Sequence, residues 1–198
     1  MAGEEGVTGV VLAGGMGRRM GGRDKGLIEV AGRPMARWVL DALAPQVEFV
    51  RINANRELET YRGWGVPVDT DRHAGFLGPL AGIATALARA STELVAVAPC
   101  DAPLLPDDFV RRLRGALERS ASAEIAVARA HGRWQPVFAL LRRDLLPELD
   151  ARLAAGERGL YRWYRTRETV EADFEDVADR LANVNTCEDV AETERSLL

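Results

Sequence analysis

Short apolar segments alternate with amphipathic ones along most of the chain. Residues 8–13 form an apolar run with glycines close on either side, which predicts a strand buried on both faces. In residues 34–44 the apolar side chains recur at helical spacing behind a proline, which predicts an amphipathic helix. The same alternation continues toward the C-terminus.

The remaining segments extend this order. The expected strands cover residues 47–53, 67–71, 94–98, 125–129, 137–141 and 170–174, with a hairpin turn at His131 and Gly132. The expected helices begin at Pro79 and cover residues 107–117, 145–154, 160–165 and 188–197. This order is typical of an α/β protein with a mainly parallel sheet covered on both faces. No linker or repeat divides it, so we expect one domain over residues 1–198.

Ligands of such sheets bind in the loops that follow the carboxyl ends of the strands. Four expected loops of this kind contain Lys25, Asn53, Asp71 and Asp101. Asp101 and Asp71 each end a strand, and a carboxylate there suits Mg²⁺, which takes one or two carboxylates together with phosphate oxygens. Asn53 could hydrogen-bond a ribose or a base. The alternative is that all three are turn or cap residues.

Composition limits the classes of ligand. Of the 198 residues, 47% are hydrophobic and 28% charged, and the formal net charge is −4, which excludes a general nucleic-acid binder. Cys100 and Cys187 have no metal-ligand spacing, and no run reaches the ~18 apolar residues of a membrane span. We therefore expect a reduced, cytoplasmic protein without nucleic-acid or membrane partners.

Lys25 is the only lysine, because the other 25 of the 26 basic residues are arginines. A compact ammonium on a flexible stem can reach bound phosphates where a planar guanidinium does not fit. Lys25 closes the glycine-rich stretch 12–26, which also carries three arginines. This stretch matches neither the dinucleotide fingerprint nor the P-loop, yet its glycines and charges suit phosphate. The alternative is a surface turn with solvated arginines.

These features favour a nucleoside triphosphate, magnesium and transfer at phosphorus. No serine lies in a nucleophile elbow. His73 and His131 are interpreted as surface loop residues and Cys100 as a buried small side chain. An arginine-rich stretch, 152–167, surrounds Trp163 and Tyr164 and is either a holder of an anionic ligand or a solvated helix face.

The motifs together resemble those of the molybdenum cofactor guanylyltransferases almost from end to end. The matching stretches are LAGGMGRRMGGRDKG (12–26), INANR (52–56), GPLAG (78–82), PCDAPLLP (99–106) and NVNTCED (183–189). The resemblance implies a three-layer, Rossmann-like nucleotide-diphospho-sugar transferase fold with a mainly parallel mixed sheet. It also implies a Mg²⁺-dependent transfer of GMP from GTP to molybdopterin, with release of pyrophosphate and formation of molybdopterin guanine dinucleotide.

The same resemblance implies roles for individual residues. Those that would bind GTP are Leu12, Ala13, Gly14, Gly15, Lys25, Asn53, Asp71 and Asp101. Lys25, Asp101 and Arg19 would be catalytic, with Mg²⁺ on Asp101. Asn183 and Asn185 would contact the pterin, and the arginine-rich stretch is a second candidate for holding it. Cys187 stands where the family has proline, at the start of the last expected helix.

Several related functions stay open. The related cytidylyltransferases carry LAAG where this chain has LAGG, so Gly14 favours guanine. The alternatives are a molybdenum cofactor cytidylyltransferase, a sugar-1-phosphate nucleotidyltransferase and a non-catalytic GTP-binding module. An oxidoreductase is the weakest alternative, because the third glycine of its fingerprint is missing. The resemblance also allows transient contact with other molybdenum cofactor proteins.

Overall fold

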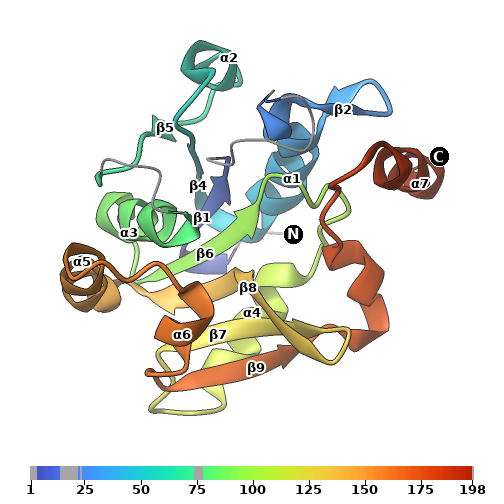
Figure 1. The fold of residues 1–198 in the computed structure, drawn as a ribbon. Coiled ribbons are helices and arrows are strands. Elements are labelled where there is room, and N and C mark those ends of the chain that lie inside the picture. The colour runs from blue at the N-terminus through green and yellow to red at the C-terminus, as the bar shows by residue number, and fades with distance from the viewer. Residues whose placement is uncertain (1–3, 14–21, 23, 74–77, 198) are drawn as a thin grey trace.

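The computed structural model describes residues 4–13, 22, 24–73 and 78–197. Its main feature is a seven-stranded sheet in the order β5-β4-β1-β6-β8-β7-β9 (Figure 1). The strands are β1 (Glu4–Leu12), β4 (Val47–Asn53), β5 (Val68–Asp69), β6 (Leu94–Pro99), β7 (Ile125–Ala130), β8 (Arg133–Arg142) and β9 (Thr169–Asp173). A small second sheet pairs β2 (Glu29–Val30) with β3 (Arg33–Pro34).

The sheet is mainly parallel, which confirms the expected fold class. β1 lies parallel to β4 and β6, β4 to β5, and β7 to β9, whereas β8 runs antiparallel to β6 and β7. The carboxyl ends of β1, β4, β5 and β6 therefore meet at one edge. Because β8 is reversed, it begins at that same edge.

Helices cover both faces of the sheet and complete three layers. One core cluster joins the sheet to α1 (Met35–Leu43) and α4 (Phe109–Glu118). The opposite cluster joins it to α3 (Pro79–Arg89), α5 (Leu146–Ala154) and α6 (Leu160–Tyr164). Two further helices, α2 (Leu58–Arg62) and α7 (Cys187–Leu197), lie at the periphery, and α7 packs beside β2 (Figure 1).

The helical spacing in the sequence predicts most of the buried side of α1. Met35, Val39 and Leu43 are fully buried, and each contributes about 1.5–3 kcal/mol of hydrophobic stabilisation. Trp38 and Ala42, which the same spacing predicts to face inward, are only half-buried. The indole of Trp38 donates a hydrogen bond to the carbonyl of Val30, so it covers the β2–β3 turn and not the main sheet.

Three local predictions need correction. The strand expected at 67–71 ends at Asp69, so Asp71 lies two residues beyond it. The strand expected to begin at residue 137 begins at Arg133. The sequence did not predict α2 or the β2–β3 pair, because elements of five and two residues are too short for a periodic pattern.

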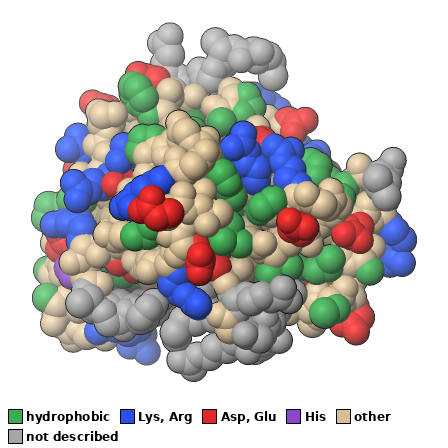
Figure 2. Space-filling view, turned by 90° about the horizontal axis from the view of Figure 1, so that it is seen from above, with side chains coloured by type: hydrophobic (Ala, Val, Ile, Leu, Met, Phe, Trp, Pro, Cys, Tyr) green, Lys and Arg blue, Asp and Glu red, His purple; other side chains and the backbone are tan. Residues whose placement is uncertain are grey.

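Charged side chains of both signs intermingle on the face that carries α2 and β2 (Figure 2). Extended regions of a single sign, which would suit a polyanion, are not visible on the described part of that face. Within the described ranges, no helix combines the length and the apolar character that a bilayer crossing requires.

Candidate active site

Lys25 begins a short 3-10 helix, η2 (Lys25–Leu27), whose position is fixed by its cap. The carboxylate of Asp24 accepts hydrogen bonds from the backbone N–H of Gly26 at 3.0 Å and from the Tyr61 hydroxyl at 2.7 Å. Burial raises the pKa of Asp24, against the lowering effect of these bonds. A side chain at Gly26 would place its Cβ 2.5 Å from the Tyr61 hydroxyl, so the turn packs closely only with glycine.

The Lys25 ammonium connects two distant parts of the chain. It donates hydrogen bonds to the Asp101 carboxylate and, at 2.7 Å, to the side-chain carbonyl of Asn185. The side chains of Lys25 and Asp101 are each 14% exposed, so the pair is largely shielded but open to a ligand. We call Lys25, Asp101 and Asn185 the central cluster.

The segment that carries Asn185 is anchored at both ends. The Asp101 carbonyl accepts a hydrogen bond from the backbone N–H of Val184 at 2.8 Å. Asp189 accepts from the backbone N–H groups of Asn185 and Thr186, and these bonds lower the pKa of its carboxyl. The Thr186 hydroxyl accepts from the N–H of Asp189, which completes a capping box. Helix α7 therefore begins at Cys187 without a proline there.

A second group of predicted residues lies where β1 and β4 end. The Leu12 carbonyl accepts from the backbone N–H of Cys100, and the Ala13 N–H donates to the Asn53 carbonyl at 2.7 Å. The Asn53 side chain is buried. A Cβ at Gly82 would lie 2.8 Å from the Asn53 Oδ1, so the final glycine of GPLAG lets α3 approach this strand end.

Asp71 pairs with a residue that the sequence did not single out. Its carboxylate accepts a hydrogen bond from the side-chain amide of Asn55 at 2.8 Å, and its backbone N–H donates to the Asn55 Oδ1 at 2.9 Å. The other carboxylate oxygen, Oδ1, is buried and has no partner among the described residues. That oxygen is an acceptor which a ligand N–H or O–H group could satisfy.

Not every predicted site residue can be placed. Gly14, Gly15 and Arg19 lie outside the described residues. Asn183 is exposed, and its backbone carbonyl accepts a hydrogen bond from the Asn185 side chain at 3.1 Å. The central cluster is joined by direct contacts, whereas Asn53 and Asp71 belong to the neighbouring strand ends.

The interpretation of Trp163 and Tyr164 as ligand contacts is wrong. Both rings are fully buried, because α6 turns them toward the sheet. Three arginines of the same stretch also form ion pairs, Arg152 with Glu148, Arg162 with Glu157 and Arg167 with Glu124.

Cys100 is buried and His131 lies in an exposed turn, as predicted, whereas His73 is not the free surface residue that the sequence suggested. His73 is half-buried and pairs with Asp150, and neither it nor the exposed His131 contacts the central cluster. Burial raises the pKa of the Cys100 thiol well above its ordinary value, so the thiol stays protonated and unreactive. Among its described residues, the site therefore offers charge and hydrogen bonds but neither a thiolate nucleophile nor an obvious base.

The described residues can supply only part of a Mg²⁺ coordination shell, and the phosphates and water would supply the rest. In the part of the chain that the structure describes, no group of three or more His, Cys, Asp and Glu side chains could hold a metal ion. Mg²⁺ typically binds one or two carboxylates and completes its shell with phosphate oxygens and water. Asp101 fits this pattern, because its Oδ1 accepts no hydrogen bond from a described residue.

The sheet order is that of the Rossmann-like nucleotide-diphospho-sugar transferase fold, and the family match and the relatives given next show that the chain is a nucleotidyltransferase. The chain belongs to the MobA-like NTP transferase family, whose domain it matches over residues 9–172. Molybdenum cofactor guanylyltransferases from Shewanella sediminis and Shewanella pealeana are 44% and 46% identical over 92% of this chain, which covers 92% and 90% of their lengths.

Two solved structures share the fold at low sequence identity. Molybdopterin-guanine dinucleotide biosynthesis protein A from Archaeoglobus fulgidus superposes with a TM-score of 0.80 at 22% identity, over 96% of this chain and 98% of its own. The 4-diphosphocytidyl-2C-methyl-D-erythritolsynthase from Anaerococcus prevotii has a TM-score of 0.75 at 13% identity, over 96% and 95%. At these identities the likeness concerns the fold alone.

Proposed function

We propose that this protein transfers GMP from GTP to molybdopterin, releasing pyrophosphate and forming molybdopterin guanine dinucleotide. The observation that carries the proposal is the central cluster at the carboxyl edge of the sheet, in a chain 44–46% identical to proteins named molybdenum cofactor guanylyltransferase. These relatives do not favour a cytidylyltransferase or a sugar-1-phosphate nucleotidyltransferase.

GTP binds along the ends of β1, β4 and β5. Leu12, Ala13 and Asn53 lie on the nucleoside side, and the unpartnered oxygen of Asp71 accepts a hydrogen bond from the nucleoside. In the sequence, Gly14, Gly15 and Arg19 come between β1 and Lys25, and we assign them to the phosphates of GTP. Backbone N–H groups of such glycine-rich loops and nearby cations bind phosphate oxygens.

The transfer needs no base from the protein. A phosphate monoester has a second pKa near ~6, so the terminal phosphate of molybdopterin is largely dianionic at neutral pH. One of its oxygens attacks the α-phosphorus of GTP. A new oxygen–phosphorus bond forms, and the bond from the α-phosphorus to the oxygen bridging to the β-phosphorus breaks. Pyrophosphate leaves with that electron pair.

Lys25 and Arg19 stabilise the negative charge that moves to the leaving pyrophosphate. Asp101 would hold Mg²⁺, which when bound would supply positive charge against the phosphates. Asn185 accepts a hydrogen bond from the Lys25 ammonium and so keeps that charge directed into the site. Together with Asn183, it faces the acceptor. The reaction takes place in the cytoplasm, with transient contact to other molybdenum cofactor proteins.

Release of pyrophosphate from GTP tests the proposal. We expect release only when both molybdopterin and Mg²⁺ are present, with one guanylated pterin formed per pyrophosphate. Chelation with EDTA should lower the rate at least ~100-fold, and added Mg²⁺ should restore it. Faster product formation from CTP than from GTP would favour a cytidylyltransferase. GTP binding without pyrophosphate release would indicate a non-catalytic module.

A further inference from the structure

The hairpin of β7 and β8 extends beyond the strand that leads to Asp101. Its two turn residues, His131 and Gly132, have φ of 52° and 70°, as a type I′ turn requires. β8 pairs with β6 only from Arg142 back to Ala139. Between β7 and β8, Val127 lies opposite Ala139, but its neighbour Ala128 lies opposite Gln135. Residues 136–138 of β8, with Pro136 among them, therefore form an irregular stretch. Irregularities of this kind re-aim side chains near functional sites.

The tip of this hairpin and α6 together form a pocket of about 550 Å³. Its lining residues are Gly132, Arg133, Trp134, Tyr161, Arg165 and Glu171. The rings of Trp134 and Tyr161 lie 5.1 Å apart between centroids, and the Arg165 guanidinium lies 5.9 Å from the Tyr161 ring. Tyr161 is 50% exposed, so an aromatic surface is open to a ligand. We call this the hairpin pocket.

Its charges suit a planar anionic ligand. Among the described residues, Arg133 and Arg165 form no ion pair, although most arginines around them do. Glu171 accepts a hydrogen bond from the Trp134 indole at 2.7 Å and lies 3.5 Å from Arg129, which fixes its carboxylate at the pocket wall. Aromatic rings stack flat heterocycles, a carboxylate accepts from their N–H edge, and free guanidinium groups bind phosphate.

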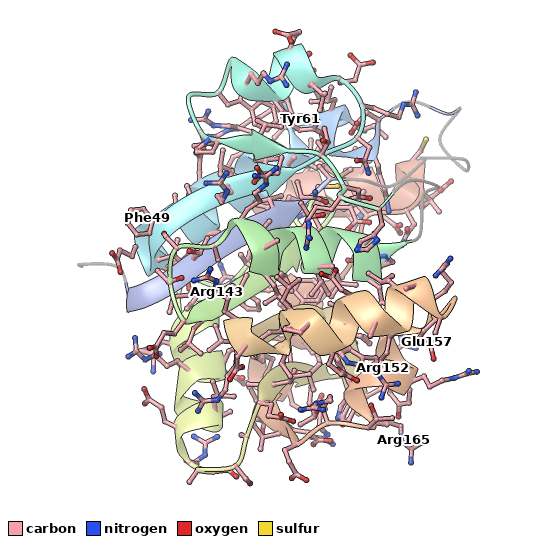
Figure 3. The ribbon with its side chains drawn as sticks, turned by 90° about the vertical axis from the view of Figure 1, so that its left-hand side faces the viewer. Phe49, Tyr61, Arg143, Arg152, Glu157 and Arg165 are labelled. Carbon is pink, nitrogen blue, oxygen red and sulfur yellow. The ribbon has the colours of Figure 1, made fainter. Side chains whose placement is uncertain are left out.

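The sheet order separates this pocket from the nucleotide side. β1, β4 and β5 lie on one side of β6, and β8, β7 and β9 lie on the other. β8 is the direct neighbour of β6, about 4.8 Å away, and it begins at the edge where Asp101 follows β6. Arg143 follows the end of β8, at the edge of the sheet away from Asp101. Figure 3 shows Arg165 toward the opposite end of the molecule. In-line displacement requires the acceptor to approach opposite the leaving group.

We propose that the hairpin pocket holds the pterin ring of the acceptor, stacked on Tyr161 and Trp134. Arg133 and Arg165 face its anionic groups, and Glu171 accepts from its amino-pyrimidinone edge. This inference rests on the proposed function, because it takes molybdopterin as the acceptor. Guanine has the same amino-pyrimidinone edge as the pterin. The proposed function places guanine on the β1–β4 side, so the experiment must exclude its binding in the hairpin pocket.

Two substitutions test the pocket against a matched control. Tyr161→Ala and Arg165→Gln each remove an exposed group, and Phe49→Ala removes a ring of equal exposure (49%) at the opposite end (Figure 3). We expect the KM for molybdopterin to rise about tenfold in the first two variants, since stacking and phosphate contacts are of that size. The KM for GTP, the kcat at saturating molybdopterin, and all constants of Phe49→Ala should stay within about twofold.

A binding titration separates this inference from the proposed function. Pterin-6-carboxylate, which is fluorescent, is titrated into the protein without GTP. Wild type and Phe49→Ala should bind it, and the other two variants should bind about tenfold more weakly. If wild type bound it in this way but made no guanylated pterin, the proposed function would fail and the pocket would stand. Equal binding by all four proteins, no binding by wild type, or a rise in the KM for GTP alone would overturn the pocket.

Discussion

Replacing Asp101 with asparagine is expected to lower kcat/KM for guanylyl transfer by about 1,000-fold or more. Asparagine keeps the size of the side chain but removes the negative charge that pairs with Lys25 and that Mg²⁺ requires. The Lys25 ammonium keeps its hydrogen bond to Asn185, so the melting temperature should fall by no more than about 5 °C. Steady-state kinetics and thermal unfolding monitored by circular dichroism measure the two effects.

Asp108→Asn is the control for this variant. Asp108 forms ion pairs with Arg111 and Arg112 on α4, so the substitution removes a paired carboxylate of the same kind away from the site. Its kcat/KM should stay within about twofold of wild type. Wild-type turnover by Asp101→Asn would show that this carboxylate serves only the fold.

Replacing Lys25 with alanine is expected to cost about 1,000-fold in kcat/KM, and Lys25→Arg about 100-fold. Alanine removes the charge that faces the phosphates. Arginine keeps the charge, but its planar guanidinium must fit a largely shielded space between Asp101 and Asn185 that a compact ammonium fills. The measurement is guanylated pterin formed over time at saturating GTP.

The reciprocal exchange Arg111→Lys controls for the change in chemistry. Arg111 is an exposed arginine on α4, and lysine there should change activity by less than about twofold. Full activity of both variants would mean that the single lysine of this chain has no special role. Full activity of Lys25→Arg together with a loss in Lys25→Ala would assign the role to charge alone.

The layers and most elements were predictable because each long element carries a periodic signal. The apolar run of β6 and the helical spacing of α1 indicate buried faces without knowledge of their partners. The β2–β3 hairpin has no such signal. Its turn places Ala31 at φ 51°, where sequence rules look for asparagine or aspartate before glycine.

The candidate site was predictable only in part. The sequence indicates that Lys25 and Asp101 follow strand ends, and the placement of β1 between β4 and β6 brings them into contact. Asn185, 160 residues from Lys25, could be assigned only by resemblance. Asp24 and Asn55 lie inside the quoted motifs, but their partners are set by tertiary contacts.

The choice of aromatic residues shows the same limit. Trp163 and Tyr164 lie among arginines in the sequence, and Tyr161 lies beside them. On a helix of five residues, the orientation of each side chain depends on how the helix packs. Here the packing buries the first two rings and leaves Tyr161 exposed beside Trp134.

A crystal structure with GTP and Mg²⁺ bound would locate the nucleotide. We expect the triphosphate at Lys25, the ion on Asp101, and the nucleoside along Leu12 and Asn53. A structure with this edge of the sheet empty, or with the guanine in the hairpin pocket, would contradict the assignment of Lys25 and Asp101 to phosphate transfer.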